Sequence, residues 1–229
     1  MEPDVVPLVN AAEIGLISEQ FQLEHLIGQG AQSIVFLGRD LILARPVAVK
    51  VFLSKRFQIY KNAESPDSEA ELDEDAERFL RGTRTMATLN HENVVRVLAS
   101  GFSSGGYPYC VMDFCSGESL AVILKNGPLN QEMFAKTFLP VLDGLEHLHG
   151  HGVLHRDLKP ENIVVSINDD GRVLPVIIDF GIAKWDKSLV EVSTNTVTEP
   201  NTILGTPNYM SPEQCASMAV GPASDIYSL

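Results

Sequence analysis

The chain has 229 residues, of which 45% are hydrophobic and 21% are charged, and 17 Lys and Arg residues against 30 Asp and Glu residues give it a formal net charge of −13. This length and composition allow one large or two smaller hydrophobic cores, which excludes a disordered chain and a small disulfide-held fold. The negative charge argues against general binding to nucleic acid or to anionic membranes. We expect a cytoplasmic protein, because no apolar stretch is long enough to span a bilayer, the N-terminus lacks the positive charges of a secretory signal, and the three cysteines form no paired motif.

The first half of the sequence has the pattern of a β-sheet interrupted by one helix. Residues 21–51 carry short runs of β-branched and aromatic residues separated by glycines, which predicts successive strands. A helix is predicted next from the spacing of four apolar residues, Leu72, Ala76, Phe79 and Leu80. Residues 94–98 and 109–114 then predict two further strands, with a turn at 101–106 between them.

An acidic segment runs into the predicted helix. Eight acidic residues and no Lys or Arg lie between Glu64 and Glu77, and without them the net charge would be −5. The segment is either a solvated loop that leads into the first turns of the helix, where carboxylates suit the positive end of the helix dipole, or a docking patch for a basic partner.

The sequence beyond Gly117 is mainly helical in pattern. An apolar residue recurs every three or four positions from Phe134 to Leu148, which predicts a helix with one broad apolar face, and Pro140 predicts a kink or local break in it. The same region contains four closely spaced histidines, His147, His149, His151 and His155. Their spacing does not bring them to one helix face, so we do not expect a metal site. Strands before the midpoint and helices after it predict a two-lobed α+β architecture, with a ligand between the lobes.

Two segments of the first half are candidates for phosphate binding. Residues 28–35 have the sequence G-Q-G-A-Q-S-I-V between two strand-like runs. Glycines there let the backbone approach phosphate oxygens, although the same residues also suit a simple hairpin turn. Lys50 lies in the next predicted strand between Val49 and Val51. A lysine in that setting either reaches an anion such as a nucleotide phosphate or extends to solvent.

The most specific segment is His155-Arg156-Asp157-Leu158-Lys159-Pro160-Glu161-Asn162, which is followed by Asp179-Phe180-Gly181 after an apolar strand. It supplies a carboxylate that can accept a hydroxyl proton, and an amide and a second carboxylate that can hold Mg²⁺. Together with a lysine near the phosphate, these are the groups that phosphoryl transfer needs.

In this order the segments resemble the eukaryotic-type (Hanks-type) protein kinase family. The resemblance extends to residues 205–214, with the sequence G-T-P-N-Y-M-S-P-E-Q, and Lys159 is similar to the serine/threonine branch and to bacterial members. It implies an α+β, two-lobed protein kinase-like fold with a β-rich N-lobe and a mainly helical, incomplete C-lobe. The expected divisions are an N-terminal flank at 1–20, the N-lobe at 21–112, a hinge at 113–116 and the C-lobe at 117–229.

The resemblance further implies an ATP-dependent kinase that transfers the γ-phosphate to Ser or Thr hydroxyls of proteins, with ATP and Mg²⁺. Catalytic roles fall on Asp157, Lys159 and Asn162, and metal binding on Asn162 and Asp179. The expected ATP-binding residues are Gly28, Gln29, Gly30, Ala31, Ser33, Val35, Ala48, Lys50, the gatekeeper Met112, and Asp113 and Cys115 of the hinge. No nucleic-acid partner is expected, and membrane attachment is expected only through sequence beyond Leu229.

An arginine beside the catalytic aspartate implies regulation by phosphorylation. In the family, an arginine at the position of Arg156 pairs with a phosphate on the segment after Asp-Phe-Gly. The resemblance favours Thr198 and Thr202 as sites of autophosphorylation. The alternative is that this Ser/Thr/Asn-rich segment is simply a solvated loop.

Two departures from the family leave alternatives open. The family pairs the strand lysine with a glutamate of the following helix, and counting back from Leu89 places Gly82 at that position. The chain is then either an active kinase that positions Lys50 by other means or a pseudokinase-like nucleotide-binding or scaffold module; the retained Asp157, Asn162 and Asp179 favour the first. Because family members continue well past Leu229, we also expect this piece alone to be poorly folded or inactive.

Overall fold

The computed structural model describes residues 14, 16–30, 32–53, 74–179 and 207–229. The chain divides into two compact units. The first unit takes in residues 1–88 and 96–114, and the second takes in residues 89–95 and 115–229. The short segment 89–95 therefore belongs to the second unit although it lies within the first half of the sequence.

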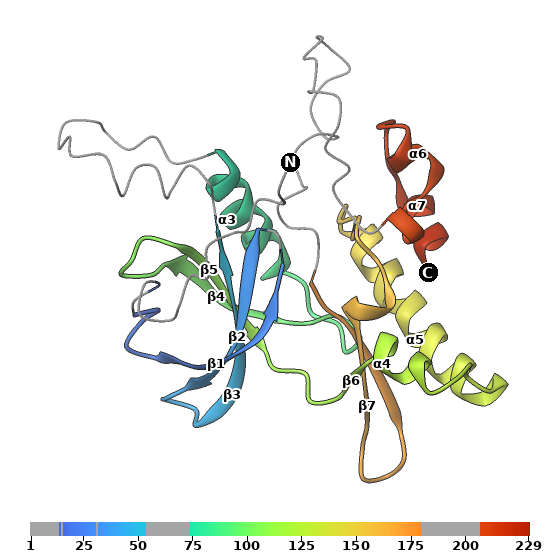
Figure 1. Ribbon diagram of the computed structural model, residues 1–229, viewed down its shortest axis with the longest axis horizontal. Coiled ribbons are helices and arrows are strands. Elements are labelled where there is room, and N and C mark those ends of the chain that lie inside the picture. Colours follow the sequence, from blue (N-terminus) through green and yellow to red (C-terminus); the bar gives the residue numbers. More distant parts are fainter. Residues whose placement is uncertain (1–13, 15, 31, 54–73, 180–206) are drawn as a thin grey trace, which may run out of the picture. The chain divides into compact units, whose positions relative to one another are not determined.

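The first unit is built on a five-stranded antiparallel sheet with the strand order β1-β2-β3-β5-β4 (Figure 1). Its strands are β1 (Phe21–Gln29), β2 (Ser33–Asp40), β3 (Arg45–Phe52), β4 (Val97–Phe102) and β5 (Pro108–Asp113). The prediction of a strand at 94–98 and a turn at 101–106 was wrong in its boundaries. β4 starts later and continues to Phe102, because it pairs with β5 as far as Pro108. Val94 instead forms an isolated bridge with Ile177, whose carbonyl oxygen accepts from the backbone N–H of Val95.

One face of the five-stranded sheet forms the hydrophobic core of the first unit. Side chains of β2, β3 and β5 that alternate along each strand point to this face, as the two-residue period of a strand requires. The buried residues of this cluster are Ile14, Ile17, Phe21, Ile34, Phe36, Val47, Val49, Val51, Leu53, Tyr107, Tyr109 and Val111. Helix α3 (Glu74–Met86) packs against β4 and β5, and its Phe79 stacks on Phe52 with ring centroids 5.3 Å apart. Because Phe52 alternates with the core residues of β3, α3 covers the opposite face.

Helix α3 confirms the helix predicted between the acidic segment and β4. Ala76, Phe79 and Leu80 are buried as the spacing predicted, whereas Leu72 and most of the acidic segment lie outside the described residues. Gly82 is a buried residue within α3.

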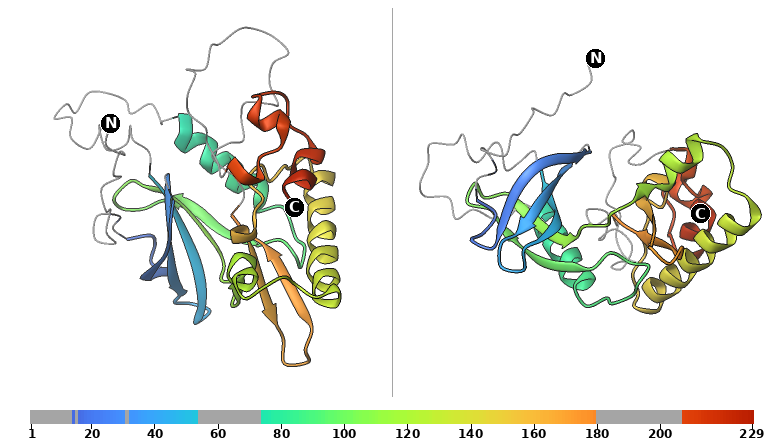
Figure 2. Two further views of the ribbon diagram at one scale, coloured as in Figure 1. Left: turned by 45° about the vertical axis from the view of Figure 1, so that its right-hand side comes forward. Right: turned by 90° about the horizontal axis from the view of Figure 1, so that it is seen from below.

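The second unit contains the long helix α5 (Gln131–Gly150), which is visible in both views of Figure 2. The side chain of Asn130 caps its N-terminus by accepting a hydrogen bond of 2.8 Å from the backbone N–H of Met133. The sequence predicted a kink or a local break at Pro140, and the helix is continuous through this residue, so there is no break. A proline removes one backbone hydrogen bond, and burial of Val141 and Leu145 on the following turns holds the helix together across that gap.

A three-stranded antiparallel sheet lies against α5, so the second unit is less purely helical than the sequence pattern indicated. Its strands are β6 (Glu118–Ser119), β7 (Ile163–Ile167) and β8 (Val173–Ile177). Gly144 allows the helix to approach this sheet closely: a Cβ atom there would lie 3.1 Å from Cδ1 of Ile177 and 3.2 Å from the carbonyl oxygen of Asn93. The segment 93–95 is held along β8 by backbone hydrogen bonds of 2.8 and 2.9 Å.

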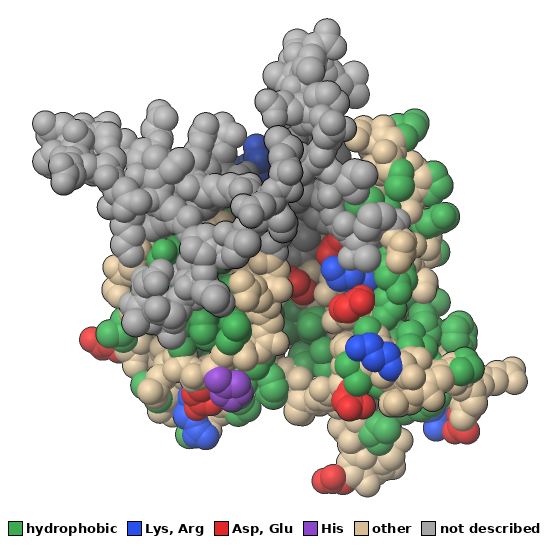
Figure 3. All heavy atoms as spheres, in the orientation of Figure 1, with side chains coloured by type: hydrophobic (Ala, Val, Ile, Leu, Met, Phe, Trp, Pro, Cys, Tyr) green, Lys and Arg blue, Asp and Glu red, His purple; other side chains and the backbone are tan. Residues whose placement is uncertain are grey.

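Short helices complete the described part of the second unit. They are α4 (Leu120–Lys125), the 3₁₀ helices η1 (Pro160–Asn162) and η3 (Pro207–Tyr209), α6 (Pro212–Cys215) and α7 (Pro222–Ser228). Hydrophobic side chains are exposed over α6 and α7 (Figure 3), among them Met218, Ile226 and Tyr227. In the part of the chain that the structure describes, no helix is both long and apolar enough to cross a membrane.

Candidate active site

The sheet of the first unit brings several residues of the expected ATP site onto one face. Lys50 of β3 lies directly across from Val35 of β2 and from Cys110 of β5. Two residues earlier on β3, Ala48 lies across from Met112. Since cross-strand partners project to the same side of a sheet, Val35, Ala48, Lys50 and Met112 share the face opposite to the hydrophobic core.

The glycine-rich segment forms the hairpin turn between β1 and β2. Gly28 and Gln29 end β1, Ser33 begins β2, and the backbone N–H of Gly30 donates to the carbonyl oxygen of Ser33 at 2.8 Å. A Cβ atom on Gly28 or Gly30 would meet no described atom closer than 3.6 Å. The described protein atoms therefore give no steric reason for glycine at these positions, which suits close approach of a bound group to the turn. Ala31 lies outside the described residues.

The end of β5 is tied to the start of β3 by an ion pair. Nη1 of Arg45 donates to Oδ1 of Asp113 at 2.8 Å, and both side chains are more than a third exposed. Cys115, the other expected hinge residue, belongs to the second unit and is half-buried.

In the second unit, His155 organises the loop that carries the expected catalytic residues. Its ring is fully buried. Nδ1 accepts a hydrogen bond of 3.3 Å from the backbone N–H of Asp157, and Nε2 donates to the carbonyl oxygen of Ile178 at 3.1 Å. Because an N–H group donates to Nδ1, the ring is neutral with its proton on Nε2. His155 thus joins the residue before Asp179 to the loop containing Asp157.

The loop brings three predicted residues together. Nζ of Lys159 lies 3.1 Å from Oδ2 of Asp157, and both side chains are about four-fifths buried, with 22% and 23% exposed. Nδ2 of Asn162 donates to the carbonyl oxygen of Asp157 at 2.8 Å, which leaves Oδ1 of the amide to accept or to coordinate. Pro160 begins η1 between these residues, at a helix position where the missing N–H of proline costs nothing.

Asp179 lies next to Asn162, because the backbone N–H of Ile178 donates to the carbonyl oxygen of Asn162 at 2.8 Å. Among the described residues, no three His, Cys, Asp or Glu side chains are grouped so as to hold a metal ion. Magnesium does not need such a group, since it commonly takes one or two protein oxygens and completes its shell with water and phosphate. The amide oxygen of Asn162 and the carboxylate of Asp179 fit that requirement.

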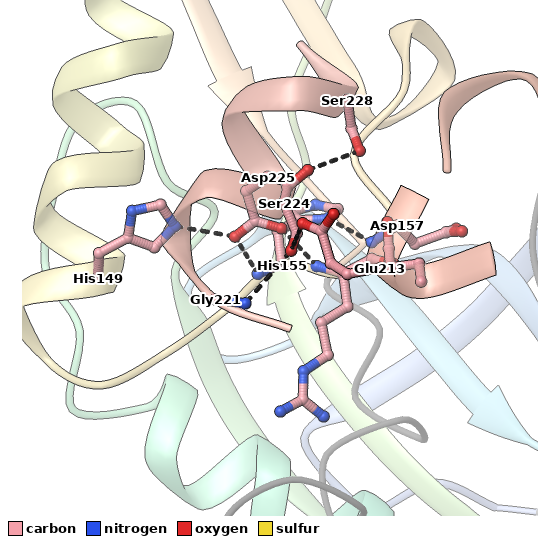
Figure 4. A network of polar contacts seen from close by, with 10 residues as sticks. His149, His155, Asp157, Glu213, Gly221, Ser224, Asp225 and Ser228 are labelled. Carbon is pink, nitrogen blue, oxygen red and sulfur yellow. Dashed lines mark hydrogen bonds and ion pairs between the residues drawn. The ribbon is translucent and has the colours of Figure 1, made fainter. Parts of the chain in front are cut away.

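A buried carboxylate that the sequence analysis missed holds the backbone of this loop. Asp225 of α7 accepts hydrogen bonds from the backbone N–H groups of His155 and Arg156, at 2.9 and 2.8 Å, and from Nε2 of His149 at 2.8 Å (Figure 4). Burial alone raises the pKa of Asp225, but the hydrogen bonds from His149, Arg156 and His155 outweigh it and lower the pKa below its usual value. The only sequence signal was a polar residue within the apolar pattern of the last segment.

Two residues of α6 extend this network. The carboxylate of Glu213 accepts a short hydrogen bond from the hydroxyl of Ser224 (Figure 4). Nε2 of Gln214 donates to the carbonyl oxygen of Arg156 at 2.9 Å. The segment around α6 and the start of α7 is thus bonded both to itself and to the catalytic loop.

The neutral ring of His155 predicts that acid destabilises the fold. Burial lowers the pKa of His155 and outweighs the opposite effects of the Ile178 carbonyl and the nearby carboxylates. In an unfolded chain the pKa of histidine is about 6.5, so below that pH the unfolded state binds a proton that the folded state does not. The free energy of unfolding therefore falls by up to about 1.4 kcal/mol per pH unit until the pH reaches the lower pKa of the folded state. Denaturant unfolding at pH 7.5, 6.5 and 5.5 measures this slope.

His147 gives this prediction a variant that leaves the catalytic loop intact. Burial and the nearby rings of His151 and His91 lower the pKa of His147. Protonation of His147 is therefore expected to destabilise the fold at low pH, as for His155. We expect His147→Gln to reduce the acid-side slope and the exposed control His25→Gln to leave it unchanged. If the native protein, His147→Gln and His25→Gln lose stability equally with falling pH, His147 does not contribute to the acid destabilisation.

Thr198 and Thr202 lie outside the described residues, as do Phe180 and Gly181.

The four closely spaced histidines noted in the sequence do not form one group. His149 bonds to Asp225, while the rings of His147 and His151 pack together with centroids 4.4 Å apart.

A five-stranded sheet with one helix, followed by a unit that carries Asp157 and Asn162 on one loop and Asp179 just after β8, defines the class of fold found in protein kinases. A sequence model of the protein kinase domain matches residues 21–229, and the chain belongs to this family. The expected α+β protein kinase fold is therefore confirmed.

The most similar proteins include bacterial kinases. The chain is 35% identical over 214 residues to the serine/threonine-protein kinase pkn2 of Myxococcus xanthus, covering 93% of this chain and 24% of that protein. It is 34% identical over 220 residues to the serine/threonine-protein kinase PknB of Mycolicibacterium smegmatis, covering 93% of this chain and 31% of that protein. The chain thus spans 24% and 31% of the length of these two relatives.

Solved structures agree with this fold. Rad53 1–466 in complex with AMP-PNP aligns with a TM-score of 0.65 and 25% identity, covering 91% of this chain and 46% of that chain. The apo form of PpkA-294 aligns with a TM-score of 0.66 and 22% identity, covering 93% of this chain and 74% of that chain.

Proposed function

We propose that the chain is the catalytic part of a cytoplasmic serine/threonine protein kinase, which transfers the γ-phosphate of ATP to Ser or Thr hydroxyls of proteins. The observation that carries the proposal is the grouping of Asp157, Lys159 and Asn162 on one hydrogen-bonded loop, with Asp179 beside Asn162. Relatives named as serine/threonine-protein kinases support it.

Each residue of this loop has a chemical task in the proposed reaction. Asp157 holds the substrate hydroxyl and takes its proton as the oxygen bonds to the γ-phosphorus, while the bond from that phosphorus to the bridging oxygen of ADP breaks and ADP leaves. Lys159, at 3.1 Å from Asp157, places a positive charge where the transferring phosphoryl group becomes more negative. Asn162 and Asp179 hold Mg²⁺, and the ion, when bound, screens the phosphate charges.

The nucleotide is proposed to bind along the face of the first sheet that carries Lys50. Val35, Ala48 and Met112 offer an apolar surface to adenine, and the ammonium of Lys50 reaches the α and β phosphates. The remaining residues proposed to bind ATP are those of the glycine turn, Gly28, Gln29, Gly30, Ala31 and Ser33, and the backbone groups of Asp113 and Cys115. Phosphorylation of Thr198 or Thr202 is proposed to pair with Arg156.

The test is transfer of labelled γ-phosphate from Mg-ATP in the full-length protein, with the acceptor residue identified by mass spectrometry. We expect phosphoserine or phosphothreonine to form, and to form far more slowly in Asp157→Asn. A rise in melting temperature with Mg-ATP tests nucleotide binding separately. Binding without any transfer would overturn the proposed activity.

The same assay also tests the pseudokinase alternative, which is raised by Gly82. The family glutamate is absent from this buried position of α3. We expect the native protein to transfer phosphate and Gly82→Glu to change the rate less than about tenfold, because the loop that performs the chemistry is complete. Transfer found only in Gly82→Glu would favour a nucleotide-binding module that has lost its activity.

A further inference from the structure

The backbone of the catalytic loop is strained at Arg156. Its φ angle is +63°, in the left-handed region that side-chain-bearing residues rarely adopt. A residue in this region persists only where its surroundings hold it, and such residues gather at functional sites. The peptide groups on either side of Arg156 must therefore be fixed by partners elsewhere in the fold.

The two sides of this residue are held by different helices. On its N-terminal side, Asp225 of α7 accepts from the N–H of Arg156 at 2.8 Å and from the N–H of His155 at 2.9 Å. On its C-terminal side, Nε2 of Gln214 in α6 donates to the carbonyl oxygen of Arg156 at 2.9 Å. That carbonyl belongs to the peptide bond that leads into Asp157, so the bond from Gln214 acts one peptide away from the proposed catalytic base.

The side chain of Gln214 is itself fixed at its other atom. Its Oε1 accepts from the backbone N–H of Ser211 at 3.0 Å, and its own backbone N–H donates to Oγ of Ser211 at 3.4 Å. This reciprocal pair is a capping box at the start of α6. Because one amide atom accepts from an N–H and the other donates to a carbonyl, only one orientation of the amide satisfies both bonds.

We propose that Gln214 is a positioning residue, which holds the Arg156–Asp157 peptide so that the Asp157 carboxylate stays aligned for proton transfer. The proposal rests on the proposed kinase function. A capping box accepts either Gln or Glu at this position, so the cap alone does not require an amide. The bond to Arg156 does require one, since glutamate would place a negatively charged oxygen against the carbonyl.

This difference gives a pair of variants that separate the two roles of the side chain. Gln214→Glu keeps the acceptor for Ser211 and removes the donor to Arg156. Ser211→Ala does the reverse, because it removes one bond of the cap and leaves both bonds of the Gln214 amide in place. Ser211 is completely buried, and its backbone N–H and its hydroxyl both bond to Gln214.

The variants are compared in the full-length protein by steady-state kinetics, thermal melting and amide hydrogen exchange of the peptide containing residues 155–159. We expect Gln214→Glu to lower kcat about tenfold with KM for ATP unchanged within about twofold, and to speed exchange of that peptide. We expect Ser211→Ala to lower the melting temperature by about 2–4 °C with kcat and exchange close to those of the native protein. If Gln214→Glu melts far below the native protein, Gln214→Met, which has no charge, is compared in its place.

An unchanged kcat and exchange rate in both Gln214 variants would overturn the proposal, as would an equal loss of kcat in Ser211→Ala. Hydrogen exchange needs no turnover. If the native protein transfers no phosphate at all, the proposed function fails, while the exchange of residues 155–159 still decides whether Gln214 holds the loop.

Discussion

Replacement of Asp157 by asparagine is expected to lower kcat for phosphate transfer about 10³-fold while the affinity for Mg-ATP changes less than about threefold. Asparagine has nearly the shape of aspartate, so the backbone bonds of the loop to His155 and Asn162 remain. It cannot take up the proton of a substrate hydroxyl, and it loses the charge that attracts Lys159 at 3.1 Å. Initial rates at saturating Mg-ATP, together with a binding titration, separate the two effects.

The matched control for this prediction is Asp169→Asn. Asp169 is exposed beyond the end of β7, outside the loop that carries Asp157, Lys159 and Asn162, and its replacement makes the same charge change. We expect its kcat to equal that of the native protein. A rate within about fivefold of native for Asp157→Asn would show that this carboxylate does not take the proton.

The sequence predicted the parts of the fold that depend on local pattern. The strands between residues 21 and 51 and the helix containing Phe79 were recognised because alternating or helical spacing of apolar residues is a property of a short segment. The start of β4 was missed for the opposite reason. Val94 and Val95 have the residue types of a strand, but Val94 forms an isolated bridge with Ile177, about eighty residues later, where the carbonyl oxygen of Ile177 accepts from the N–H of Val95. No local pattern of residues records that partner.

The same division applies to the candidate site. Asp157, Lys159 and Asn162 lie within one stretch of six residues, so a short motif was enough to single them out, and they lie close together in the structure. Asp225 and Gln214 lie roughly sixty to seventy residues further along the chain. They reach the loop only because α6 and α7 fold back onto it, so their polar side chains gave no indication of a partner.

Asp225→Ala is expected to cause the largest loss of stability among these variants. Alanine leaves three donors without an acceptor in a buried region, namely Nε2 of His149 and the backbone N–H groups of His155 and Arg156. Unpaired buried donors of this kind cost about 1–3 kcal/mol each. Because the His149 side chain is 13% exposed and can turn to solvent, we expect a total of about 3–5 kcal/mol. The free energy of unfolding of a native protein is only about 5–15 kcal/mol, so a substantial fraction of the variant would be unfolded at 37 °C.

Urea unfolding of the full-length protein measures this loss, with Asp143→Ala on the exposed side of α5 as the matched control. The stability of Asp225→Asn should lie between those of Asp143→Ala and Asp225→Ala, because one oxygen still accepts while the amide nitrogen faces a donor. If Asp225→Ala is no less stable than Asp143→Ala, the hydrogen bonds to Asp225 do not contribute to folding. The strained φ angle of Arg156 predicts one further consequence: in any Asp225→Ala molecules that remain folded, the catalytic loop relaxes, so kcat should fall by more than the unfolded fraction explains.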